Sequence, residues 1–281
     1  MKKQYILAAI GVVLVALLYF GTSISLPKKP GPVAQPAVIS AFDAESKINA
    51  LKATLTPSQS LYVSKLENGI TRGDVQKQQV TALYALADFW KDSAQAFVPY
   101  GYYLSKAVQL DNSEKNLTFA ARIFLEQLRA EQDPAAMQWE TGEAIRLFEE
   151  AIKVNPSNDS LRVGLGSAYI FGKGRNGDPQ ETMKGIQELL GVVRKDSNNM
   201  QAQLALGIGG YVSGQYDKAI DRLQKVIARE PNNLEAVAFL ADTYAAKGNK
   251  TEAVRWYTLS KRLANNPHYS TEVDERIKSL R

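Results

Sequence analysis

The chain has 281 residues, with 34 lysine and arginine residues against 29 aspartate and glutamate residues, one histidine and no cysteine. The lack of cysteine excludes disulfides, thiolate metal sites and cysteine nucleophiles, and the lone His268 excludes histidine-based metal sites and triads. Of the net charge of +5, four lysines lie in residues 1–39, which hold no acid; the remainder has 34 − 4 = 30 basic and 29 acidic residues, which argues against nucleic-acid binding.

An uncharged, apolar stretch occupies residues 5–26, between Lys3 and Lys28. A helix of about 20 residues crosses the roughly 30 Å hydrocarbon core of a bilayer. We therefore expect residues 1–26 to form an N-terminal transmembrane signal-anchor that meets the lipid bilayer through residues 5–26. A cleaved signal peptide is the alternative, but no A-x-A cleavage site follows the apolar stretch.

The short basic N-terminus favours the cytoplasmic side of the membrane. In a bacterium this predicts a single-pass protein of the inner (cytoplasmic) membrane whose C-terminal domain is periplasmic. Four prolines in residues 27–40 favour an extended linker, which would hold the folded part away from the bilayer.

Residues 41–70 predict two helices that match no repeat. The first, Ala41–Ala53, has Ser40 as its N-cap. The second, Pro57–Glu67, ends at Asn68-Gly69. These helices cap the following repeats, lie in their groove, or pair two copies of the chain into a homodimer; the sequence leaves the three roles open.

Residues 71–269 are typical of five successive helix pairs, because apolar and small residues recur at three- and four-residue spacing. The first three pairs are residues 74–90 with 95–110, 113–130 with 135–154, and 159–171 with 179–193. The third pair carries seven extra residues, 172–178, which spell G-x-G-x-x-G. A dinucleotide site needs a strand before this motif. Here a helix precedes it, so we expect a flexible turn.

The last two pairs, residues 200–267, share one pattern. Gly214 and Gly248 are 248 − 214 = 34 residues apart, and Ala219 and Ala253 are separated by the same distance. A 34-residue period with this order of small, large and turn residues resembles the tetratricopeptide repeat (TPR). The resemblance implies an all-α fold, an α-solenoid of about five TPR-like helix pairs preceded by a single transmembrane helix and linker.

Residues 270–281 predict a charged amphipathic helix that caps the last repeat. The TPR resemblance further implies that the first helix of each pair lines a concave groove for a protein or peptide. Counted by position within each repeat, the groove residues are Val163, Ser167, Ile170, Leu204, Ile208, Tyr211, Glu235, Phe239 and Asp242. These residues suit an amphipathic helix or an extended apolar segment. Internal packing, or a groove filled by helices 41–67, is the other interpretation.

No catalytic, cofactor-binding or metal-binding constellation is found. The carboxylate pairs Glu140–Glu143 and Glu149–Glu150 are expected on solvated helix faces. The layout also resembles membrane-anchored bacterial envelope TPR proteins. We therefore predict a non-enzymatic, membrane-anchored scaffold or adaptor that binds proteins or peptides during assembly, translocation or maturation of envelope proteins. A cytosol-facing adaptor and a self-assembling structural envelope protein are the alternatives.

Overall fold

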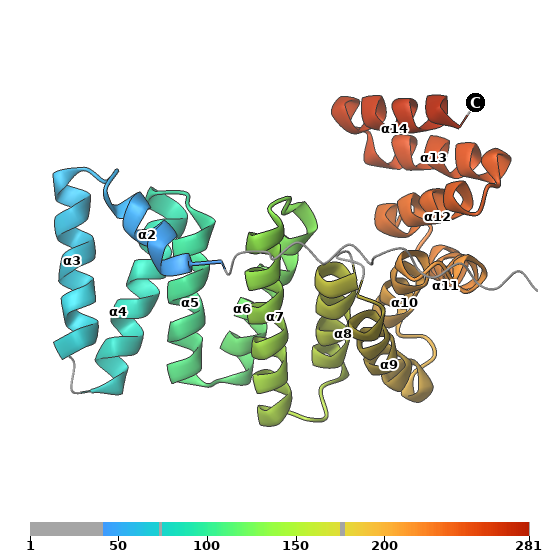
Figure 1. Cartoon of the computed structure of the whole chain (residues 1–281). Helices are drawn as coiled ribbons and strands as arrows, with labels where there is room; N and C mark the ends of the chain where they lie inside the picture. The colour runs from blue at the N-terminus through green and yellow to red at the C-terminus, as the bar shows by residue number, and fades with distance from the viewer. Residues whose placement is uncertain (1–41, 73–74, 175–177, 281) are drawn as a thin grey trace, which may run out of the picture. The chain divides into compact units, whose positions relative to one another are not determined.

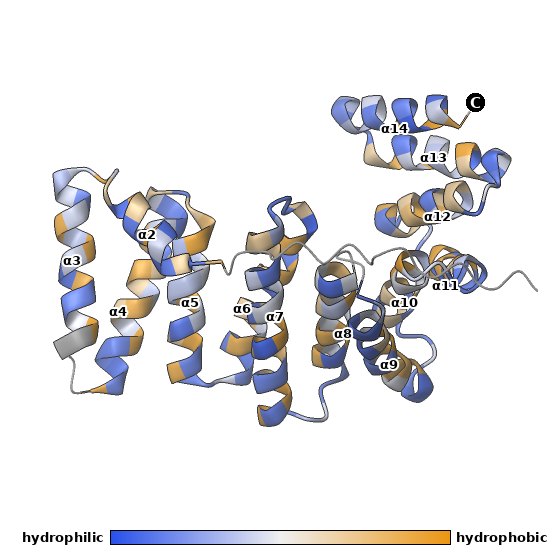
Figure 2. Ribbon diagram, in the orientation of Figure 1, coloured by the Kyte–Doolittle hydropathy of each residue, from blue (hydrophilic) through white to orange (hydrophobic). Residues whose placement is uncertain are grey.

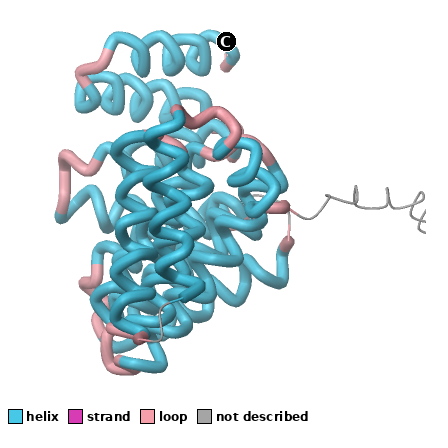
Figure 3. Tube along the Cα trace, turned by 90° about the vertical axis from the view of Figure 1, so that its left-hand side faces the viewer, coloured by secondary structure: helices cyan, strands magenta, loops and turns pink. Residues whose placement is uncertain are grey.

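The computed structural model describes residues 42–72, 75–174 and 178–280, which contain thirteen α-helices, two π-helical turns and no strand. Short loops join the helices, which succeed one another in chain order (Figures 1 and 3). They are α2 (Ala44–Lys52), α3 (Pro57–Arg72), α4 (Gln76–Asp88), η1 (Phe89–Ser93), α5 (Phe97–Asp111), α6 (Glu114–Ala130), α7 (Pro134–Val154), α8 (Asp159–Ala168), η2 (Tyr169–Gly174), α9 (Pro179–Lys195), α10 (Met200–Val212), α11 (Tyr216–Arg229), α12 (Leu234–Ala246), α13 (Lys250–Ala264) and α14 (Pro267–Ser279).

The five predicted helix pairs are confirmed. The partners of each pair pack extensively against each other: α4 with α5, α6 with α7, α8 with α9, α10 with α11, and α12 with α13. Contacts between consecutive pairs then join these units into an α-solenoid. No pair buries its apolar face alone, so the core runs on from one pair to the next.

Asparagine is the N-cap of the first helix in each of the last three pairs. The side chains of Asn158, Asn199 and Asn233 accept hydrogen bonds from backbone N–H groups in the first turns of α8, α10 and α12. Such caps satisfy donors that have no partner inside the helix. The entry of the chain into each of these helices is thus determined locally.

Glycine allows the two helices of the third pair to approach closely. A Cβ atom at Gly166 of α8 would lie 2.8 Å from the carbonyl oxygen of Gly185 in α9, and one at Gly185 would lie 2.6 Å from that of Gly166. Gly207 and Ala219 occupy the matching places in the fourth pair. The repeated small residues are therefore a packing requirement.

The N-terminal helices differ from their predicted bounds. Helix α2 begins at Ala44, and Asp43, not Ser40, is its N-cap. Helix α3 runs to Arg72, through the Asn68-Gly69 pair that was expected to end it. The side chain of Ile70 packs against the core formed with α4 and α5, and this contact outweighs the local turn signal.

The first and third pairs share an irregularity, because α4 and α8 each continue into a π-helical turn. The expected flexible turn at 172–178 is therefore wrong for residues 172–174, which belong to η2. Gly172 is buried, and a Cβ atom there would lie 2.1 Å from Oγ1 of Thr141 in α7. Residues 175–177 lie outside the described part of the chain.

Helix α14 begins at Pro267, before the predicted start at residue 270, with Asn266 as its N-cap. It packs against α13 and buries Val273, which is 2% exposed. Its remaining surface is largely hydrophilic (Figure 2). Helix α14 thus covers the apolar side of the last pair.

No helix in residues 42–72, 75–174 or 178–280 is long and apolar enough to cross a membrane. The predicted signal-anchor and linker, residues 1–26 and 27–40, lie outside these ranges.

Candidate functional site

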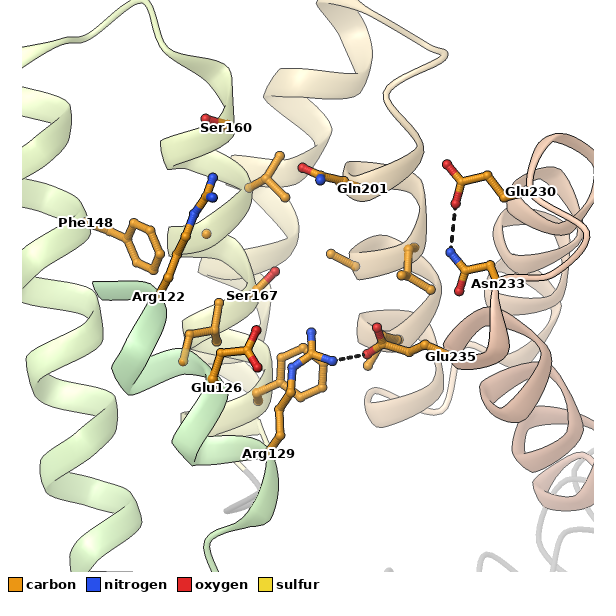
Figure 4. A pocket seen from close by; sticks show the side chains of 17 residues that line it. Arg122, Glu126, Arg129, Phe148, Ser160, Ser167, Gln201, Glu230, Asn233 and Glu235 are labelled. Atoms are coloured by element: carbon orange, nitrogen blue, oxygen red, sulfur yellow. Dashed lines mark hydrogen bonds and ion pairs between the residues drawn. The ribbon is translucent and has the colours of Figure 1, made fainter. Parts of the chain in front are cut away.

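A groove of about 430 Å³ lies between α6, α8, α10 and the start of α12. Figure 4 shows side chains from these elements turned toward a common space. The four helices are the first members of pairs two to five. The stacking of the pairs therefore places their first helices around one depression.

The floor of the groove is apolar. Its side chains come from α6, α7, α8, η2 and α10: Leu125, Phe148, Val163, Phe171, Leu204, Ala205 and Ile208. Gly164 brings α8 close to α7 here, since a Cβ atom at this position would lie 2.3 Å from the ring of Phe148. The floor can accept apolar side chains from a ligand.

The rim of the groove is charged on both sides. Arg122, Glu126 and Arg129 follow one face of α6, and Glu230 and Glu235 flank the start of α12. Arg129 donates a hydrogen bond from Nη1 to Oε1 of Glu235 at 2.6 Å, across the groove (Figure 4). Its guanidinium carbon also lies 4.8 Å from the ring centroid of Phe171. Arg129 therefore bridges the two walls.

Five of the nine predicted groove residues line this depression: Val163, Ser167, Leu204, Ile208 and Glu235. They come from three different helix pairs, so the repeat offset identified positions that the fold brings together.

The other four predicted positions do not line the groove. Ile170 is fully buried, because it packs against the glycine positions Gly185 and Gly209. The rings of Tyr211 and Phe239 contact each other, with centroids 5.9 Å apart.

Asp242, the remaining predicted position, joins the last three helices. Its Oδ1 accepts a hydrogen bond from the Tyr257 hydroxyl at 2.5 Å and one from Nη1 of Arg276 at 2.9 Å. Burial, and then the hydrogen bond to Asp242, raise the pKa of Tyr257. Asp242 therefore ties α12 to α13 and α14.

The sequence prediction missed the α6 wall. Arg122, Glu126 and Arg129 are spaced four and three residues apart, which is the spacing of one helix face, but no groove offset was assigned to the second pair. Gln201 at the start of α10 and Phe171 in η2 were also missed. The helical spacing of the α6 charges was the available signal.

Helices α2 and α3 do not fill the groove, since none of its lining residues comes from them. Helix α3 packs on α4, and α2 packs on α5. Phe42, just before α2, stacks on Trp139 of α7 with ring centroids 5.1 Å apart. The groove thus remains open to a partner.

Glu140 departs from the expected solvated position, since it is 1% exposed. It lies on the buried face of α7, and its Oε2 atom has no hydrogen-bond partner among the described residues. Burial, followed by the charge and hydrogen bond of Glu131 and the charge of Asp133, raises the pKa of Glu140 to about 8. The carboxyl is therefore protonated at neutral pH.

Within the described ranges, no group of three histidine, aspartate or glutamate side chains is placed to hold a metal ion. The groove instead combines an apolar floor with charges of both signs, an arrangement suited to holding a peptide segment.

Comparison with known proteins supports the repeat assignment. The family model described as Tetratricopeptide repeat matches residues 213–271, which run from just after α10 into α14. No curated protein sequence matches the chain.

Solved structures of other proteins are similar to the chain, and one of them has a TM-score above 0.5. A thermophilic TPR protein of Thermus thermophilus is 17% identical, covers 72% of this chain and 98% of its own, and has a TM-score of 0.53. The MamA protein is 19% identical, with coverages of 66% and 92% and a TM-score of 0.45. YrrB, described as a TPR protein with an unusual peptide-binding site, is 16% identical, with coverages of 75% and 97% and a TM-score of 0.43.

Proposed function

Because the chain is a tetratricopeptide repeat protein, we propose that it is a non-enzymatic scaffold that binds a peptide segment of a partner protein in the groove between α6, α8, α10 and α12. The observation that carries this proposal is the groove itself, with its apolar floor and its rim of opposite charges. Apolar side chains of a ligand gain free energy by burial on such a floor, and rim charges orient the segment.

Crosslinking from Gln201 tests the proposal. Gln201 is exposed and lines the groove on α10, whereas Gln224 is an exposed glutamine on α11 of the same helix pair and lies outside the groove. A photo-crosslinking amino acid at position 201 is expected to capture the partner in cells, and the same substitution at position 224 is not. Capture of the same partner with equal yield from both positions would contradict binding in the groove.

The second part of the proposal concerns location. Residues 5–26 anchor the chain in the inner membrane of a bacterium, residues 27–40 act as a spacer, and the repeats face the periplasm. The uncharged apolar stretch between Lys3 and Lys28 supports this arrangement. The partner would then be a protein of the envelope, and the scaffold would act in its assembly, translocation or maturation.

A reporter enzyme that is active only after export, fused behind Arg281, is expected to be active. Replacing residues 5–26 by a polar segment of equal length should abolish that activity, because the hydrophobic signal for membrane insertion is lost. An inactive reporter on the intact chain, with a cytosolic reporter active in its place, would instead establish a cytosol-facing adaptor.

A further inference from the structure

Two charges on the α6 wall are unpaired within the described part of the chain. Arg122 and Glu126 are both exposed, and neither makes a hydrogen bond or an ion pair with another described residue. They are four residues apart, so they face the same side of the helix. Arginine before glutamate is the weaker order for such a pair, which leaves both groups available to a ligand.

The neighbouring charged groups already have partners within the protein. Arg129 is paired with Glu235 and lies on Phe171. Glu230, near the opposite wall, accepts a hydrogen bond from Nδ2 of Asn233 at 2.8 Å. The charge pattern open to a ligand is thus one cation and one anion on α6, beside the apolar side chains of α10.

An exposed aromatic side chain continues the same face of α6. Phe119 lies one turn before Arg122 and is 53% exposed.

The spacing of the two charges fits an extended ligand. Four residues of helix rise about 6 Å, and two residues of an extended segment span about 6.6 Å. Alternate side chains of an extended segment along α6 can therefore reach Arg122 and Glu126. The side chain between them points the other way, toward Leu204 of α10.

The geometry points to a partner segment that is extended and carries the pattern acidic–large apolar–basic, with its acid on Arg122, its base on Glu126 and its apolar side chain on Leu204. This inference rests on the proposed function, since it names the chemistry of the segment that the groove binds.

Fluorescence anisotropy with labelled peptides and the full chain in detergent tests the pattern. A peptide centred on Asp-Leu-Lys is expected to bind about fivefold or more tightly than Asp-Leu-Asp or Lys-Leu-Lys, since each exposed ion pair contributes about two- to fivefold in affinity. Arg122→Gln should weaken binding of Asp-Leu-Lys by about two- to fivefold and leave Asn-Leu-Lys unchanged. Arg255→Gln on α13 removes the same charge outside the groove and is expected to change neither affinity.

The outcomes separate the two proposals. If Asp-Leu-Lys, Asn-Leu-Gln and the like-charged peptides all bind equally and crosslink to position 201, the groove binds peptides but the charge pattern is wrong. A helix-forming peptide that binds more tightly than its extended counterpart would overturn the inferred conformation. If no peptide binds, or if bound peptides crosslink to position 224 and not to position 201, the proposed function fails together with the inference.

Discussion

Phe148→Ala is expected to lower the free energy of unfolding by about 3–5 kcal/mol, the usual cost of removing a fully buried phenylalanine ring. Phe148 is 0% exposed, and its ring lies against Gly164, so it joins the second helix pair to the third. In a solenoid each pair is stabilised by its neighbours, so a cavity at this interface weakens both units. The measurement is urea unfolding followed by circular dichroism.

Phe119→Ala is the matched control. The same atoms are removed from α6, but Phe119 is 53% exposed and the expected change is within about 0.5 kcal/mol. Equal losses in the two variants would show that the ring of Phe148 does not carry the contact between the pairs.

The stability of the protein is expected to fall between about pH 4.5 and pH 8, because Glu140 holds its proton in the folded state up to a pKa of about 8, against a reference value of 4.5. In this window the unfolded chain has released a proton that the folded chain retains, so rising pH favours unfolding. The contribution of protonated Glu140 to the free energy of unfolding is fully present below pH 4.5. It then falls by up to about 1.4 kcal/mol for each pH unit until the carboxyl ionises in the folded state.

Glu140→Gln removes this pH dependence, because the amide has a similar shape and carries no charge at any of these pH values. The variant is expected to be more stable than the natural chain at pH 8, and the difference should shrink as the pH falls toward 4.5. Urea midpoints measured at each pH check this.

Glu143→Gln is the matched control for Glu140→Gln, since it changes the other carboxylate of the predicted pair, which is bonded to Arg146. The Glu143→Gln variant is expected to show the same pH dependence of stability as the natural chain. Parallel profiles for the natural chain and Glu140→Gln from pH 4.5 to 9 would contradict the buried, protonated state of Glu140.

Much of the solenoid could be predicted because its signals are local. The asparagine caps Asn158, Asn199 and Asn233 act on N–H groups within three residues, and helical spacing of apolar side chains identifies the buried faces. Small residues at a fixed period, such as Gly166 and Gly185, then indicate where helices approach. Five of the nine predicted groove positions followed from that period alone.

The groove could be predicted only in part, because its walls combine helices far apart in the sequence. Arg129 and Glu235 are 106 residues apart and meet only when four pairs have stacked. Ile170 was predicted to line the groove but is buried in the core. Its side chain fills the space left by the missing side chains of Gly185 and Gly209.

The helices, their pairing and the repeat follow from local signals, because caps, helical periodicity and small residues act within a few residues of one another. Three features depend on packing between helices: α3 continues through Asn68-Gly69, Glu140 is buried, and α6 forms a wall of the groove. In each case a contact with a different helix outweighs or adds to the local preference, since burial against a neighbouring helix contributes more free energy than one residue's intrinsic propensity.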